Sequence, residues 1–110
     1  MRTPDAPMGI SLVATVRNEQ ATIRAFVESL LSQTTLPDEV IIVDGASTDG
    51  TLEILRQFAA AGKIRLISQP CNIAQGRNLG IGQARHEFIA VTDAGCRVEP
   101  DWIERRPVYG

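Results

Sequence analysis

The 110-residue chain has few of the residues on which several protein classes depend. It contains one histidine, two cysteines and a single lysine, Lys63. Cys71 and Cys96 are not spaced as in a Cys-x-x-Cys motif and have no histidine at ligand spacing, which argues against a zinc site or a disulfide framework. We therefore expect both thiols to be reduced, as in a reducing compartment.

An excess of positive charge and a long apolar run are also missing. The net charge is -2 and the pI is near 5.3, so the chain offers no basic surface for nucleic acid. No segment resembles a signal peptide or a membrane span. These features predict a cytoplasmic location, with a peripheral membrane contact open for a longer form of the protein.

What the chain does have is an alternation of strand and helix patterns. At 44% hydrophobic residues it is long and apolar enough for one domain. Short β-branched runs predict strands at 10–16, 40–43, 64–67 and 88–91, separated by helical patterns. We expect an α/β fold with a Rossmann-like, mostly parallel sheet and helices on both faces. Residues 10–104 would form half of such a domain, between tails at 1–9 and 105–110.

The helical patterns differ in strength. The first is expected to be capped by Asn18 and the second to be stopped by Gly62. The third, at 74–84, is interrupted by glycines and is weaker. A short helix is expected to open at Pro100, with Trp102 and Phe26 packed in the core. The inward positions of the first two helices are Ile23, Phe26, Val27, Leu30 and Leu31, then Leu52, Leu55, Phe58 and Ala59.

Polar residues follow the predicted strands at the point where each one ends. In open parallel sheets the ligand binds beyond the carboxyl ends of the strands, so these residues predict a shared site. Asp44 precedes Gly45, and its carboxylate could accept a hydrogen bond from a base or a ribose hydroxyl. The alternative is that Asp44 only caps the next helix, a role that we favour for Asp49 and Thr51.

Two further residues are candidates for phosphate chemistry. Asp93 follows the fourth strand and could hold a divalent cation that also meets phosphate oxygens, or it could only cap a loop. Arg77 could pair with phosphate through its planar guanidinium, or it could form an ordinary surface ion pair. His86 is expected to be a surface residue.

Four segments together resemble the family 2 glycosyltransferases with the GT-A fold. They lie at 11–19, 39–51, 76–78 and 92–96, and they match in order and spacing along nearly the whole chain. The most specific is the Val-Asp-x-x-Ser-Thr-Asp-Gly-Thr element that begins at Val43.

The resemblance implies an inverting transferase that binds a nucleotide-diphosphate sugar, most often a UDP-sugar, with Mg²⁺ or Mn²⁺ bridging the diphosphate. By the same resemblance, Thr15 and Arg17 would lie along the base and ribose, and Asp44 would bind the base. Arg77 would approach the nucleotide or its phosphates. Asp93 would be the first acid of the Asp-x-Asp metal motif.

The chain departs from the family pattern at three positions. Thr15 stands where the family often has proline, Gly45 where it often has a second aspartate, and Gly95 in place of the second acid of Asp-x-Asp. The catalytic base of the family, an acid in the acceptor-binding half, has no matching position here. We therefore expect that these 110 residues alone transfer no sugar.

Other functions fit the sequence less well. A degenerate module that binds a nucleotide or another chain without catalysis is the main alternative. A nucleotidyltransferase would need a glycine-rich, basic loop after the first strand, and a phosphoacceptor domain would need a lysine late in the chain. We also expect an exposed sheet edge to favour self-association.

Overall fold

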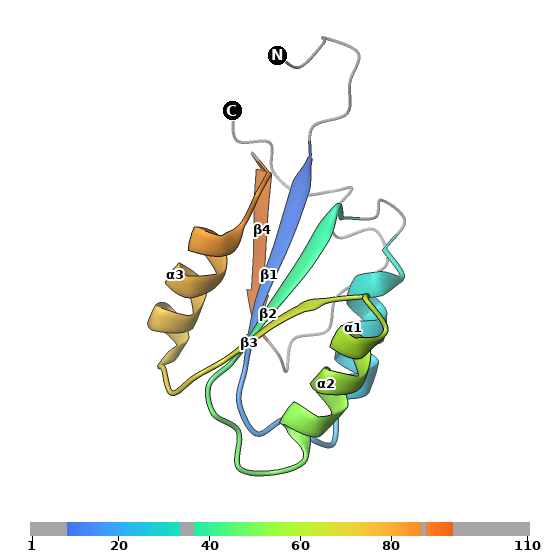
Figure 1. The fold of residues 1–110 in the computed structure, drawn as a ribbon, viewed down its shortest axis with the longest axis vertical. Coiled ribbons are helices and arrows are strands. Elements are labelled where there is room, and N and C mark those ends of the chain that lie inside the picture. The colour runs from blue at the N-terminus through green and yellow to red at the C-terminus, as the bar shows by residue number, and fades with distance from the viewer. Residues whose placement is uncertain (1–8, 34–36, 87, 94–110) are drawn as a thin grey trace, which may run out of the picture.

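The fold is a single parallel sheet with helices on both of its faces. The computed structural model describes residues 9–33, 37–86 and 88–93. Within them the strand order is β3-β2-β1-β4, and every neighbouring pair is parallel (Figure 1). In chain order the elements are β1 (Ile10–Val16), α1 (Ile23–Leu31), β2 (Glu39–Asp44), α2 (Thr51–Ala60), β3 (Arg65–Ser68), α3 (Ile73–Gln83) and β4 (Phe88–Asp93).

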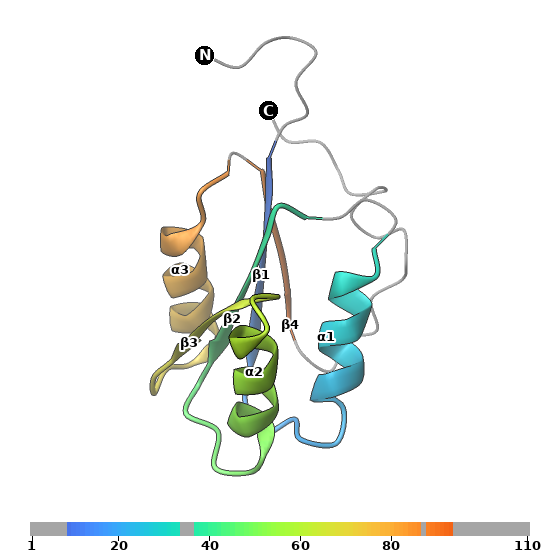
Figure 2. The same cartoon turned by 45° about the vertical axis from the view of Figure 1, so that its right-hand side comes forward.

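The helices form two layers around the sheet. α1 and α2 lie side by side on one face, and α3 lies on the other (Figure 2). This arrangement follows from right-handed connections between parallel strands, and it confirms the predicted α/β class. Because all strands run in the same direction, the carboxyl ends of β1, β2 and β4 lie at one edge of the sheet.

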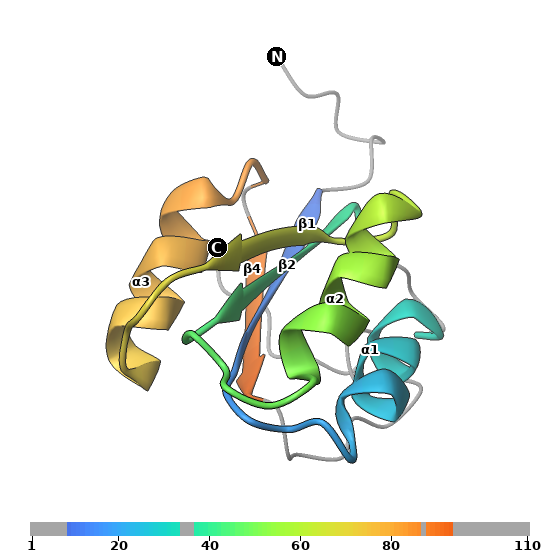
Figure 3. The same ribbon diagram turned by 60° about the horizontal axis from the view of Figure 1, so that its bottom comes forward.

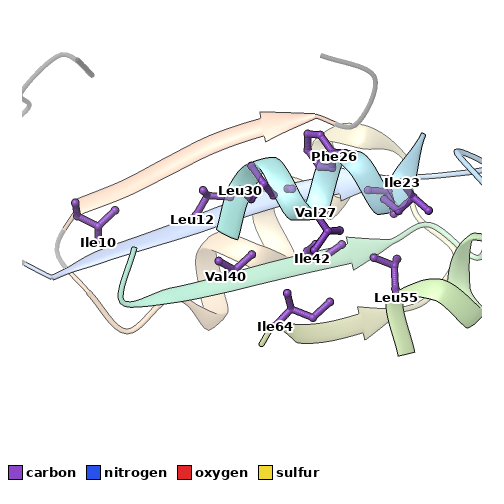
Figure 4. Packing of buried hydrophobic residues seen from close by; sticks show 12 residues of the cluster. Ile10, Leu12, Ile23, Phe26, Val27, Leu30, Val40, Ile42, Leu55 and Ile64 are labelled. Atoms are coloured by element: carbon purple, nitrogen blue, oxygen red, sulfur yellow. The ribbon is translucent and has the colours of Figure 1, made fainter. Parts of the chain in front are cut away.

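The larger part of the core lies between the sheet and the α1/α2 layer. Ile23, Phe26, Val27 and Leu30 of α1 are buried there as predicted, together with Leu55 of α2 (Figure 4). The predicted inward residues Leu31, Phe58 and Ala59 are only partly buried against this cluster, and Leu52 is not part of it. Alternation along β1 directs Leu12, Ala14 and Val16 into this layer. The buried members of the cluster are Ile10, Leu12, Ala14, Val16, Ile23, Phe26, Val27, Leu30, Val40, Ile42, Leu55 and Ile64.

The α3 layer is thinner because glycines bring the helix close to the sheet. A Cβ placed on Gly80 would lie 2.3 Å from Val13 Cγ1, and one on Gly76 would lie 3.0 Å from Thr15 Cγ2. Both glycines are buried. The glycines that weakened the helical pattern are therefore the residues that let α3 dock.

The predicted C-terminal end of α2 at Gly62 was right, and the predicted start of α1 at Asn18 was wrong. Gly62 has a φ of 75°, and the N–H of Lys63 donates to the Phe58 carbonyl, which closes α2 in a Schellman motif. α1 instead begins at Ile23 after Thr22, and Asn18 does not cap it. Asn18 bonds to the loop after β2, a tertiary contact that replaced the expected local one.

A partly buried polar cluster joins the amino ends of the strands to the end of α3. Glu39 Oε2 accepts hydrogen bonds from Ser11 Oγ at 2.6 Å and from the Arg85 backbone N–H at 2.7 Å, and Oε1 lies 2.9 Å from Arg65 Nη1. Burial alone would raise the pKa of Glu39. The bonds from Ser11, Arg85 and Arg65 outweigh burial and lower that pKa below its ordinary value.

Several sequence predictions lie outside the described residues. These are the short helix at Pro100, the packing of Trp102, and the roles of Gly95 and Cys96. Among the helices that the structure does describe, none is both long and apolar enough for a bilayer crossing. Self-association through a sheet edge stays a prediction; Ile89 of β4, at the edge of the described sheet, is 37% exposed.

Candidate functional site

A pocket of about 600 Å³ lies at the carboxyl edge of the sheet. It opens between the ends of β1 and β2 and the amino end of α3. Its residues are Thr15, Val16, Arg17, Glu19, Val43, Gly45, Cys71, Asn72, Ile73 and Ala74. Aliphatic and small side chains form much of this wall, and charged groups come from the β1 end. Such a pocket suits a flat, partly apolar group attached to a charged one.

Two of the predicted site residues line this pocket. Thr15 is 7% exposed and belongs to β1, whereas Arg17 follows that strand and is exposed. Gly45 is also in the wall, and its position explains the absence of a side chain there. A Cβ on Gly45 would lie 3.1 Å from the Cys71 carbonyl oxygen, so the chain after β3 passes directly over this residue.

Asp44 ends β2 beside the pocket but is not part of its wall. Its side chain is fully buried. The carboxylate accepts from Ser47 N–H at 3.1 Å, from Ser47 Oγ at 2.5 Å and from Ser68 Oγ at 3.1 Å. A carboxylate offers about four acceptor positions, so most of its capacity is used within the protein.

The loops after β1 and β2 are joined along their length (Figure 3). Asn18 Oδ1 accepts from Thr48 N–H at 2.8 Å, and Gln20 Oε1 accepts from Gly50 N–H at 2.9 Å. The Glu19 N–H donates to Thr51 Oγ1 at 2.9 Å. Much of the Ser-Thr-Asp-Gly-Thr segment is therefore used to hold the loop that carries Arg17 and Glu19.

Asp49 supports the start of α2 through its side chain, as predicted, although Gly50 and not Asp49 is the N-cap residue. Its Oδ1 accepts from the Thr51 N–H at 2.9 Å and from Thr51 Oγ1 at 2.5 Å, at the start of α2. The hydroxyl bond from Thr51 lowers the pKa of Asp49; the smaller effect of burial opposes it, and backbone bonds add to the lowering. A charged Asp49 also suits the positive end of the α2 dipole.

The amino end of α3 supplies pocket residues for which the sequence predicted no individual role, although the polar segment 72–78 was expected at the site. Cys71, whose thiol is free, and the first residues of α3 form one wall. Asn72 and Gln75 form a capping box, with Asn72 Oδ1 accepting from Gln75 N–H at 2.7 Å. The Asn-x-x-Gln spacing is a sequence signal for this helix start, and it would have placed α3 one residue earlier than predicted.

Arg77 lies near the pocket rather than in its wall, and the side chain of Asp93 lies outside the described part of the chain. Arg77 is exposed on α3, one turn beyond Ile73 and Ala74. Asp93 is the last residue of β4 and stands in register with Thr15 of the neighbouring strand. No group of three or more His, Cys, Asp or Glu residues that could hold a metal occurs in the described ranges.

Comparison with known proteins identifies the family. The model of glycosyl transferase family 2 matches residues 11–106, nearly the whole chain. The chain belongs to this family. Family 2 membership agrees with the location of the pocket at the carboxyl edge of the sheet, where open α/β folds bind ligands.

Curated family 2 relatives are considerably longer than this chain. A putative glycosyltransferase, EpsH of Bacillus subtilis, is 36% identical over 107 residues, which cover 96% of this chain and 30% of EpsH. Glycosyltransferase AglE of Haloferax volcanii is 34% identical over 87% of this chain and 33% of its own length. The chain thus spans about a third of these relatives.

Solved structures of glycosyltransferases share the fold. S. aureus TarS 1-349 in complex with UDP gives a TM-score of 0.74 at 25% identity, covering 88% of this chain and 30% of TarS. The mannosyltransferase PcManGT from Pyrobaculum calidifontis, in complex with GDP-Man and Mn²⁺, gives 0.69 at 26% identity over 83% of this chain and 28% of its own. The architecture is the GT-A type expected from the sequence.

Proposed function

We propose that the pocket holds the nucleotide of a nucleotide-diphosphate sugar, and that the protein containing this chain transfers the sugar to an acceptor. The observation that carries the proposal is the pocket at the carboxyl ends of β1 and β2 in a family 2 chain. The complexes of similar glycosyltransferases with UDP and with GDP-Man support this class of donor. Within this class, we propose a UDP-sugar as the donor.

The roles proposed for the site residues follow from their positions. Thr15 and Arg17 line the pocket and would lie along the base and ribose. Arg77 is exposed near the amino end of α3 and would approach the phosphates, where a guanidinium can bind two oxygens at once. Asp44 ends β2 beside the pocket; to bind the base, its buried carboxylate would have to give up a bond to Ser47 or Ser68 and turn into the pocket.

Because no group of three His, Cys, Asp or Glu side chains that could hold a metal occurs among the described residues, substrate phosphates would complete the coordination of a divalent cation. Asp93 would hold Mg²⁺ or Mn²⁺ together with phosphate oxygens, because Mg²⁺ sites often use one or two carboxylates plus substrate phosphates. A bound metal would offset the negative charge that develops on the leaving diphosphate. The similar mannosyltransferase complex with Mn²⁺ supports this proposal.

Calorimetric titration with UDP and with GDP, each with and without Mn²⁺, tests the donor site. We expect one nucleotide to bind and Mn²⁺ to strengthen its binding. Asp93→Asn should remove most of the metal effect while leaving metal-free binding within about threefold, a difference under about 1 kcal/mol. Glu53→Gln, an exposed carboxylate at the start of α2, is the matched control.

Two results would contradict these proposals. A folded protein that binds neither nucleotide would refute the donor site, and an unchanged Mn²⁺ effect in Asp93→Asn would refute the metal ligand. Nucleotide binding without sugar transfer by the whole protein that contains this chain would instead support a binding module without catalysis.

A further inference from the structure

Asn18 lies in the sequence between two residues that line the pocket but does not line it itself. Arg17 and Glu19, its neighbours on both sides, line the 600 Å³ pocket, and Asn18 does not. Its φ of 52° is in the left-handed region, where asparagine is among the few residues found without large strain. The backbone conformation at Asn18 therefore determines how the chain carries Arg17 and Glu19 past the end of β1.

Asn18 is anchored through both its main chain and its side chain. Its N–H donates to Ser47 Oγ at 2.9 Å. Its Oδ1 accepts from Thr48 N–H at 2.8 Å and lies 3.4 Å from Thr48 Oγ1. Two consecutive residues of the loop after β2 thus fix the turn in the loop after β1.

The hydrogen bonds of Asn18 continue through Ser47 to the buried carboxylate of Asp44. The Ser47 hydroxyl that accepts from Asn18 donates its own proton to Asp44 Oδ1, and the Ser47 N–H donates to Asp44 Oδ2. Asp44 is fully buried, at the end of a strand in the middle of the sheet. Hydrogen bonds in such a chain strengthen one another, which makes Ser47 a fixed support rather than a rotating surface hydroxyl.

We infer that Asn18 is a positioning residue for the donor pocket, acting through Arg17 and Glu19. The inference rests on the proposed nucleotide site. It assigns to the Asp44–Ser47–Asn18 chain a role in affinity that requires no contact between Asn18 and the nucleotide. Two properties of asparagine matter: tolerance of the left-handed conformation and an acceptor oxygen at Oδ1.

These properties predict an order among substitutions. Asn18→Asp keeps both properties, and its nucleotide affinity should stay within about threefold of wild type. Asn18→Gly keeps only the backbone freedom, and Asn18→Ala keeps neither. Loss of the Oδ1 bond together with strain at positive φ should weaken binding by about tenfold or more in Asn18→Ala, with Asn18→Gly between the two.

Gln20 provides a matched control within the same pair of loops. Its Oε1 accepts from Gly50 N–H at 2.9 Å, as Asn18 Oδ1 accepts from Thr48 N–H. Gln20 does not line the 600 Å³ pocket either, but it adjoins only one residue that does, Glu19, and its φ is not positive. Gln20→Ala should therefore loosen the same loop contact and leave nucleotide affinity within about threefold.

The experiment is calorimetric titration of these variants with UDP or GDP, whichever the wild-type protein binds. A double variant with Arg17→Ala tests the route: if Asn18 acts through its neighbours, Asn18→Gly should cost less affinity when Arg17 is already absent. Equal losses in Asn18→Ala and Gln20→Ala, or no loss in Asn18→Ala, would overturn the inference.

A second measurement separates this inference from the proposed function. Backbone ¹⁵N order parameters of Arg17 and Glu19, recorded without nucleotide, should fall in Asn18→Ala and stay near wild type in Asn18→Asp and Gln20→Ala. A wild-type protein that binds no nucleotide would refute the proposed donor site. Unchanged order parameters in Asn18→Ala would refute the positioning role even if the nucleotide binds.

Discussion

Glu39 offers the sharpest test of how the sheet is stabilised at its amino edge. Its carboxylate is 10% exposed and accepts from Ser11 Oγ and Arg85 N–H at 2.6 and 2.7 Å. Hydrogen bonds to charged groups contribute about 1.5 kcal/mol or more each. The ion pair with Arg65 adds only about 0.5 kcal/mol because the Arg65 side chain is 36% exposed.

Glu39→Ala should therefore lower the free energy of unfolding by about 3 kcal/mol, since the buried Ser11 hydroxyl and the Arg85 N–H both lose their acceptor. For a domain of about 100 residues, this corresponds to a fall in Tm of roughly 12 °C or more. Urea unfolding followed by circular dichroism measures the change, with exposed Glu28→Ala on α1 as the control. A loss below about 1 kcal/mol, or one equal to that of Glu28→Ala, would refute the reasoning.

The same cluster predicts a dependence of stability on pH. Because the pKa of Glu39 is lowered in the folded state, its contribution is complete above the ordinary glutamate pKa. That contribution is lost as the pH falls from about 4.5 through the lowered value. Glu39→Gln should reduce the slope of unfolding free energy against pH in this range, and an unchanged slope would contradict the assignment.

Two further predictions concern α3 and Asp44. Gly80→Ala should lower the free energy of unfolding by roughly 1–2 kcal/mol because its Cβ would overlap Val13 Cγ1. Gly82→Ala should raise it by about 0.5–1 kcal/mol because a Cβ at Gly82 meets open space and alanine favours the helix. Urea unfolding measures both changes, and the opposite order would mean that α3 docks differently. If Asp44 binds the base, Asp44→Asn should weaken nucleotide binding at least tenfold, whereas Ser68→Ala frees an acceptor and should keep or improve it. Equal losses by calorimetry would mean that Asp44 acts only as a support.

The sequence predicted α1 and α3 with different success for a physical reason. The apolar stripe of α1 repeats with the helical period, and four of its five predicted inward residues are buried, with Leu31 partly buried. α3 docks through Gly76 and Gly80, which contribute no apolar side chain to the periodicity. A helix that packs against a sheet through glycines contributes few apolar side chains, so the hydrophobic pattern of the sequence indicates it only weakly.

The hydrogen bonds of the site could also be predicted only in part from the sequence. The location of Asp44 at a strand end was predictable from the apolar run before it. Its partner Ser68 was not, because that bond joins residues 24 positions apart on neighbouring strands. Asn18 looked like a helix cap because the pattern shows only local partners, whereas its actual partners lie in the loop after β2.

The central place of β1 in the sheet has a consequence for synthesis on the ribosome. β1 pairs with β2 as soon as residue 44 has emerged, but its other edge pairs with β4, which begins at Phe88. At about 5–20 residues per second, translation of residues 45–87, which separate β2 from β4, takes roughly 2–9 s. For those seconds the most apolar strand of the nascent chain has one open edge. A pause in translation before Phe88 would lengthen that exposure, and a chaperone that binds extended apolar segments would find its target in β1.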